Sequence, residues 1–335
     1  MAYTTIDNPE LYFQTKLYSG SNSSQSITLD GDQNMQPDWV WIKSRNGNSR
    51  DHCWYDSVRG VNKRLQSNTS DAEDTTSDQL TSFDSNGFSM GVGEADINSG
   101  GRTYVAWNWK ESATAGFDIV SYTGNGSART ISHSLSAVPN WILVKPRENS
   151  SEGWAAYHHQ IASDPQTDSI RLDETNPAFD NNGYWNDTAP TSSVFTVGND
   201  NATNVNGEGI IAYLWSEKQG FSKFGSYEGN GSSDGTFIYT GFKPAWVVTK
   251  SIDTTSHWNC KDNKRSTFNR VDDYHKLNEP TAEDTGVSSH AMDFLSNGFK
   301  HRGDNDEVNG SETYIYMAFA ESPFVNSNGV PTNAR

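Results

Sequence analysis

The chain has 335 residues and a formal net charge of −17, from 42 acidic and 25 basic side chains. Such an acidic chain repels nucleic-acid phosphates and anionic lipid head groups, which argues against a nucleic-acid or membrane-surface partner. The 11 Trp, 14 Tyr and 15 Phe exclude a disordered chain. No apolar run reaches the roughly 18 residues of a membrane-spanning helix, and residues 1–7 lack the basic and apolar regions of a signal peptide.

After an arm, residues 1–11, the chain repeats itself. Four features occur three times each, in constant order and about 105 residues apart: a Tyr-x-Gly turn, a Pro-x-Trp run ending in Lys, an aromatic run, and a glutamate two residues after that run. The Pro-x-Trp runs occupy 37–43, 139–145 and 244–250. The sequence therefore predicts three diverged copies of one unit. Their bounds are 12–115, 116–219 and 220–323, followed by a tail, 324–335.

Each unit is predicted to contain short strands in the same order. Alternating apolar residues, typical of half-buried strands, predict the first strand at 12–18, 116–122 and 220–227 and the second at 26–29, 130–135 and 236–240. The Pro-x-Trp run is the predicted third strand, because Pro can occupy a first strand position and Trp, Val and Ile suit a pleated surface. A fourth strand is predicted around 54–56, 154–158 and 258–262.

The second half of each unit begins with a polar stretch that we expect to be a surface loop, at 67–79, 164–190 and 269–289. A strand is then predicted at 83–88, 194–197 and 294–299. The Asn-containing turns at 97–100, 205–207 and 308–310 predict tight hairpins before the aromatic last strand. No helical apolar stripe exceeds two turns. The predicted fold is all-β, with three tandem antiparallel β-sandwich repeats of a jelly-roll-like kind.

Tryptophan rings are candidate platforms for stacking on sugars. Trp39, Trp141 and Trp246 recur at one position of each unit, so we assign them to the core. Trp41 and Trp185 are not repeated. They are therefore the better candidates for glycan platforms, although a core position is the more common place for such residues.

The sequence offers weak candidates for metal binding. Asp304 and Asp306 supply the hard oxygen ligands that Ca²⁺ prefers, but the EF-hand spacing is missing and a solvated turn is favoured. His-Glu-x-x-His, Cys-x-x-Cys and Gly-x-Ser-x-Gly motifs are absent. Nothing among the acidic residues singles out the carboxylate pair that a glycosidase needs. We expect no catalytic residue, no resident metal and no cofactor.

Two further features are interpreted as structural. Asp56 with Arg59, and Asp262 with Arg265, form an Asp-x-x-Arg pattern in the first and third units, which predicts a repeated salt link. The two cysteines, Cys53 and Cys260, are too few for a disulfide framework and are expected to be reduced thiols.

The sequence as a whole resembles a family of proteins from marine tailed bacteriophages that are of virion or tail-fibre type and of undefined function. The resemblance rests on the turn at 122–126, the Pro-x-Trp runs, the Phe-x-Ser-Asn-Gly-Phe motif, and the ending 314–324 followed by 333–335. It covers nearly the whole chain. It implies a virion component made in the bacterial cytoplasm, and it brings no catalytic residues with it.

The resemblance leads to three functional expectations. The first is a non-enzymatic tail-fibre or adsorption protein whose polar loops contact a host surface glycan or protein. The second is a capsid-decorating or appendage-building protein whose partners are other virion proteins. The third is a glycan depolymerase.

The oligomeric state stays open. Phage fibres are often homotrimers, whereas three units in one chain can also imitate threefold symmetry within a monomer. The arm and the tail lie outside the repeat and are polar. We therefore expect them to become ordered on docking to the particle.

Overall fold

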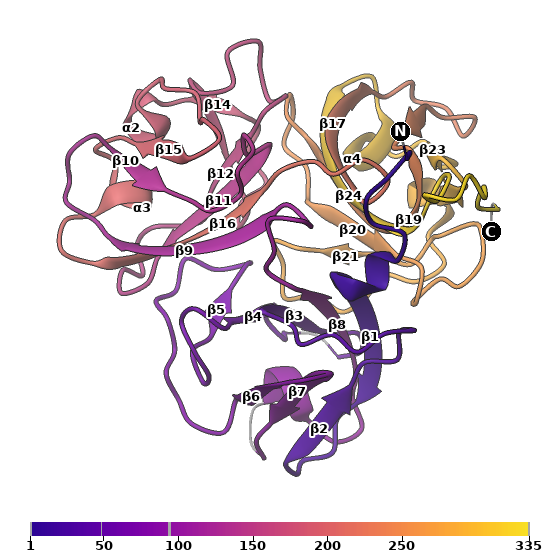
Figure 1. Ribbon diagram of the computed structural model, residues 1–335, viewed down its shortest axis with the longest axis horizontal. Helices are drawn as coiled ribbons and strands as arrows, with labels where there is room; N and C mark the ends of the chain where they lie inside the picture. The colour runs from indigo at the N-terminus through magenta and orange to yellow at the C-terminus, as the bar shows by residue number, and fades with distance from the viewer. Residues whose placement is uncertain (1, 48, 93–94, 334–335) are drawn as a thin grey trace.

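The computed structural model describes residues 2–47, 49–92 and 95–333. Three lobes surround a common centre, one for each unit of the repeat (Figure 1). We call them unit 1 (12–115), unit 2 (116–219) and unit 3 (220–323). The described elements are antiparallel strands with a few single-turn helices, so the predicted all-β sandwich class is confirmed.

Unit 1 is a sandwich of two sheets. The inner sheet faces the centre of the molecule and has the order β1-β8-β3-β4-β5; the outer sheet has the order β2-β7-β6. The inner strands are β1 (Phe13–Ser19), β8 (Thr103–Trp109), β3 (Trp39–Ser44), β4 (Cys53–Asp56) and β5 (Leu65–Gln66). The outer strands are β2 (Gln25–Thr28), β7 (Gly87–Met90) and β6 (Leu80–Asp84).

Units 2 and 3 repeat this plan. The inner sheet of unit 2 joins β9 (Phe117–Thr123), β16 (Gly209–Trp215), β11 (Trp141–Pro146), β12 (Ala155–His158), β13 (Asp168–Arg171) and β14 (Phe179–Asp180), and its outer sheet joins β10 (Arg129–Ser132) and β15 (Val194–Val197). The inner sheet of unit 3 joins β17 (Ser222–Glu228), β24 (Thr313–Pro323), β19 (Phe242–Ser251), β20 (Asn259–Asp262) and β21 (His275–Lys276). Its outer sheet joins β18 (Phe237–Tyr239), β23 (Gly298–His301) and β22 (Met292–Leu295).

Each Pro-x-Trp strand lies in the middle of its inner sheet and serves two cores. Successive side chains of a strand point to opposite faces. In β3, Val40 and Ile42 therefore pack inside the sandwich of unit 1, whereas Trp39 and Trp41 point to the centre of the molecule. Units 2 and 3 also have sandwich cores of their own.

The largest hydrophobic cluster belongs to all three units together. Trp39, Trp141 and Trp246 are buried in it, as their repetition predicted, and rings from different units are in contact. Trp39 lies 5.4 Å from Trp215 of unit 2, and Trp109 of unit 1 lies 5.4 Å from Trp246 (ring centroids). Each tryptophan removes about 200 Å² from water, worth on the order of 5 kcal/mol. The units are thus not independent tandem domains.

The lysine that ends each Pro-x-Trp run closes the ring of units. All three lysines are fully buried. Each donates hydrogen bonds to backbone carbonyls, and one acceptor lies in the polar loop of the preceding unit. The pairs are Lys43 with Thr281 at 2.6 Å, Lys145 with Ser70 at 3.0 Å and Lys250 with Thr175 at 3.3 Å. Burial lowers the pKa of Lys43 and Lys145 to about 8 and that of Lys250 to about 7.

Two local predictions were wrong, one about turns and one about strands. The Asn-containing turns are not hairpins: they include or follow the last residues of the one-turn helices α1 (Ala95–Asn98), α3 (Asn201–Asn204) and α4 (Asp306–Asn309). The buried asparagine at the end of each helix holds the Tyr-x-Gly turn; Asn204, for example, accepts from the Asn125 amide and donates to the Ser127 carbonyl. The motifs at 83–88 and 294–299 are not single strands but the hairpins β6–β7 and β22–β23.

The polar stretches are only partly surface loops. Tyr184 and Trp185 in 164–190 and Leu277 in 269–289 are buried, because these loops cover the cores with single apolar residues that follow no period. The stretches also contain β13, β14, the helix α2 (Asn182–Trp185), β21 and the short 3₁₀ helix η2 (Ser288–His290).

The arm and the tail are already ordered, contrary to expectation. Ile6 is buried in the shared cluster, and the Thr4 hydroxyl donates to the Gln219 carbonyl at 2.7 Å, ahead of the 3₁₀ helix η1 (Pro9–Leu11). The Ser327 amide of the tail donates to Asp7 of the arm at 2.7 Å, so both ends lie beside unit 3 (Figure 1). Met1, Ala334 and Arg335 lie outside the described residues.

Candidate binding site

Neither tryptophan proposed as a glycan platform is accessible. Trp41 and Trp185 are each 2% exposed. Trp41 lies on the same face of β3 as Trp39 and donates from Nε1 to Nδ1 of His52 at 2.9 Å. Trp185 packs edge-on against Tyr157 inside unit 2, with ring centroids 5.9 Å apart. Both rings are core, so the platform prediction was wrong.

The calcium candidates do not converge on a site. Asp304 and Asp306 are exposed, and the Asp306 carbonyl accepts from the Tyr314 hydroxyl at the start of α4. Among the residues that the structure describes, no three or more His, Cys, Asp or Glu side chains are grouped so that they could hold a metal ion. Asp304 precedes the helix α4, and Asp306 is its first residue.

The two Asp-x-x-Arg pairs are salt links, as predicted. Asp56 with Arg59 and Asp262 with Arg265 are 2.5 Å apart and fully buried. Each arginine also reaches a glutamate of its own unit, which in turn pairs with an arginine of the next unit: Glu73 with Arg147, and Glu283 with Arg45. These ion pairs join units. Cys53 and Cys260 are buried thiols that form no disulfide, again as expected.

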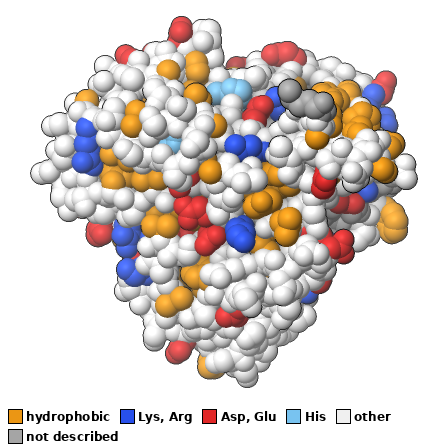
Figure 2. All heavy atoms as spheres, in the orientation of Figure 1, with side chains coloured by type: hydrophobic (Ala, Val, Ile, Leu, Met, Phe, Trp, Pro, Cys, Tyr) orange, Lys and Arg blue, Asp and Glu red, His pale blue; other side chains and the backbone are white. Residues whose placement is uncertain are grey.

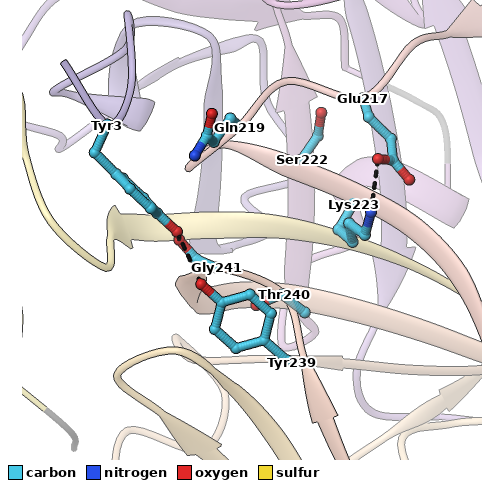
Figure 3. A pocket seen from close by; sticks show the side chains of 8 residues that line it. All are labelled: Tyr3, Glu217, Gln219, Ser222, Lys223, Tyr239, Thr240 and Gly241. Carbon is cyan, nitrogen blue, oxygen red and sulfur yellow. Dashed lines mark hydrogen bonds and ion pairs between the residues drawn. The ribbon is translucent and has the colours of Figure 1, made fainter. Parts of the chain in front are cut away.

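A pocket of about 320 Å³ lies where the arm meets the start of unit 3 (Figure 3). Three segments build it: the arm, residues 217–223 at the connection from β16 into the start of β17, and residues 239–241 at the end of β18 and in the turn to β19. It is lined by Tyr3, Glu217, Gln219, Ser222, Lys223, Tyr239, Thr240 and Gly241.

Two tyrosines form one side of the pocket and an ion pair forms the other (Figure 3). The Tyr3 hydroxyl donates to the Gly241 carbonyl at 2.8 Å and lies 3.2 Å from the Tyr239 hydroxyl. Burial, and then the contact with Tyr239, raise the pKa of Tyr3 well above its ordinary value, so this phenol stays neutral. Lys223 Nζ lies 2.7 Å from Glu217 Oε2. The pocket thus offers neutral hydroxyls and a compensated charge pair.

The exposed rings beside the pocket are peculiar to unit 3. Phe237 is 42% and Tyr239 54% exposed, while Ile238 between them is buried. Ile238, Ile27 and Ile131 are equivalent, since each pairs with a core phenylalanine of the neighbouring outer strand. Where unit 3 has the two aromatic residues, unit 1 has Ser26 and Thr28, and unit 2 has Thr130 and Ser132.

These rings therefore have no part in the common fold. The other two sandwiches form with small hydroxyl side chains at both positions. On the face drawn in Figure 2, hydrophobic side chains gather at the upper right, over the part that unit 3 and the chain ends occupy in Figure 1. The sequence alone could have singled out these two aromatic residues, because the other two copies of the second strand have small hydroxyl residues at both positions.

The ion pair is also specific to its junction. Glu111, Glu217 and Glu321 end their units in the same way, but their partners differ. Lys223 in β17 occupies the register position that Asp118 holds in β9. Glu111 therefore meets a second carboxyl group instead of an ammonium group, and burial, together with the hydrogen bond to Asp118, raises its pKa to about 7.

No helix in the described part of the chain is long and apolar enough to cross a membrane.

Comparison with known proteins places the chain in a family. A search of curated proteins gave no match. A family model described as "Domain of unknown function (DUF7483)" matches residues 8–323, which include all three units, in keeping with their shared core. The chain therefore belongs to this family of domains of unknown function.

Proposed function

We propose that the protein is a non-enzymatic virion protein of a tailed bacteriophage, a tail-fibre or other adsorption protein that contacts the host cell surface. The observation that carries the contact is the exposed pair Phe237 and Tyr239, which replaces hydroxyl residues of the other units and borders a pocket. Exposed aromatic residues with polar neighbours are typical of binding surfaces. The assignment to a phage particle comes from the sequence resemblance.

The construction of the molecule supports a role in rigid presentation. The shared cluster and the lysines Lys43, Lys145 and Lys250 join the three units into one body. A surface on such a body loses little conformational entropy when it binds. Since the threefold arrangement exists within one chain, the proposal does not require a homotrimer; light scattering on the purified protein measures its mass.

The pocket does not favour the depolymerase alternative. Glycoside hydrolysis usually needs two carboxyl groups about 5 to 10 Å apart across the bond that is cleaved. Glu217 is the one carboxylate among the described residues that line the pocket, and it is paired with Lys223.

Binding to cells tests the proposal against capsid decoration. Labelled protein is incubated with host cells and with purified particles, and an antibody locates it on intact virions by electron microscopy. We expect label at the tail, binding to host cells, and competition with phage for adsorption. Label spread over the head, with no binding to cells, would contradict adsorption and favour the decorating role.

A further inference from the structure

We infer that the pocket and the outer strand of unit 3 bind a neutral saccharide, with pyranose rings stacked on Tyr239 and Phe237 and hydroxyl groups hydrogen-bonded by Glu217 and Lys223. This inference rests on the proposed function and names the ligand class for the same surface.

The rings are placed for stacking. Phe237 and Tyr239 are two residues apart on β18, so they project from the same face about 6.7 Å apart along the strand. Phe237 lies over the next strand: its Cε2 atom would be 3.2 Å from a Cβ built on Gly298. Tyr239 is held by the Tyr3 contact. Two partly exposed rings in a row can contact consecutive sugars of one chain.

The polar groups favour a ligand rich in hydroxyls and without charge. Carboxylate oxygens accept hydrogen bonds and an ammonium group donates them. Glu217 and Lys223 offer both at 2.7 Å from each other, so together they carry no net charge. The Gln219 side chain adds an amide at the pocket wall. The net charge of −17 would repel an anionic polymer, whereas it would not repel a neutral saccharide.

The test uses variants that the chain itself suggests. Phe237→Thr with Tyr239→Ser installs the residues that unit 2 has at these positions, Thr130 and Ser132. The matched control carries Thr130→Ala with Ser132→Ala. Equal midpoints of urea unfolding establish that both proteins are folded.

The probes are neutral hexasaccharides of glucose, mannose, galactose and N-acetylglucosamine. Their binding is detected by ligand-observed NMR. We expect at least one to bind to the wild-type protein and to the control. Binding to the double variant should be weaker by about tenfold or more. Line broadening or shifts of the Tyr239 ring signals in the wild-type protein provide a second readout that does not depend on any variant.

The inference fails if no neutral hexasaccharide binds, or if the double variant binds as well as the wild type. Its failure differs from that of the proposed function. Wild-type protein and double variant that bind equally to host cells would overturn the saccharide site and leave adsorption standing. Saccharide binding without binding to cells would do the reverse.

Discussion

The hydroxyl of Tyr213 in unit 2 donates a hydrogen bond of 2.6 Å to Asp56 Oδ2 of unit 1, an atom that also binds Arg59. The junction of units 3 and 1 repeats this contact, with Trp107 Nε1 donating to Asp262 Oδ2 at 3.0 Å. At the junction of units 2 and 3, the two register positions hold His158 and Met317. Acceptor and donor have thus changed together at one junction of three.

This geometry predicts unequal effects on stability at the two ends of the contact. Asp56→Ala leaves the buried Arg59 guanidinium without its nearest carboxylate, which costs about 3 to 5 kcal/mol. Tyr213→Phe removes one donor while Asp56 keeps Arg59, which costs about 1 kcal/mol. Urea unfolding at pH 7 measures both. Equal losses, or a loss below about 1 kcal/mol for Asp56→Ala, would contradict the assignment of Asp56 to a buried ion pair.

One substitution should have opposite effects at two equivalent glutamates. The pKa of Glu111 is raised to about 7, from an ordinary value of 4.5, by burial and then by the hydrogen bond to Asp118. The folded state therefore holds a proton that the unfolded state releases, and stability is lost as pH rises from about 4.5 to 7. Glu111→Gln keeps the group neutral. It should stabilise the protein at pH 8 by about 1 to 2 kcal/mol, since Glu111 is partly exposed.

Glu217→Gln is the matched control. It removes the ion pair with Lys223 and should destabilise the protein at pH 8 by less than about 1 kcal/mol. Urea midpoints at pH 4.5 and pH 8 separate the two variants. If Glu111→Gln also destabilised the protein at pH 8, the carboxyl pair at the first junction would not be a source of repulsion.

Much of the fold followed from the sequence, because three copies show which positions stay apolar. The position of Trp39 in a strand was predictable, and alternation along that strand also places Trp41 on the same face. The partners across the centre were not predictable, since repetition shows that a residue is buried but not which neighbour covers it. Trp185 lies in a polar stretch that has no apolar periodicity, so no local sequence pattern predicted its burial.

The candidate site was predictable only in part. Comparing the three second strands singles out Phe237 and Tyr239 from sequence alone. The contact of Tyr239 with Tyr3 joins residues 236 positions apart, and no local pattern reports such a pairing. It depends on the arm crossing to the last unit. The turns at 97–100, 205–207 and 308–310 were mistaken for hairpins, because the hydrogen bonds that the helix-ending asparagines make to residues distant in sequence cannot be predicted from residue spacing.

The buried lysines should contribute more to the free energy of unfolding as the pH rises into the mildly alkaline range. Burial lowers the pKa of Lys145 to about 8, whereas in the unfolded chain it is about 10.4. Between these values the unfolded state binds more protons at this lysine, so the contribution of Lys145 to the free energy of unfolding increases with pH. Lys145→Met should reduce this increase between pH 8 and 9.5 by up to about 2 kcal/mol. The exposed Lys110→Met is the control and should leave the slope unchanged.

Urea midpoints at pH 7, 8, 9 and 9.5 provide this slope. The tyrosines with raised pKa values ionise near pH 10 in the unfolded chain, so they lower the stability of every variant alike toward pH 9.5 and cancel when Lys145→Met is compared with the wild type. A Lys145→Met protein whose stability changes with pH as the wild type does would contradict the depressed pKa of Lys145.

His301 should make the protein sensitive to acid. Burial, and then the charge of Lys261, lower the pKa of His301 to about 3, and neither ring nitrogen has a hydrogen-bond partner among the described residues. The unfolded state takes up a proton near pH 6.5 and the folded state does not, so stability is lost as pH falls below 6.5. At pH 4.5 this loss is about 2 to 3 kcal/mol. His301→Met installs the residue that unit 1 has at this position, Met90, and should abolish that part of the loss. Urea unfolding at pH 7.5 and pH 4.5 measures this loss. The variant should be at least as stable as the wild type at pH 7.5, and its advantage in stability should be larger at pH 4.5. If the difference in stability between variant and wild type were the same at both pH values, His301 would not be held neutral in the fold.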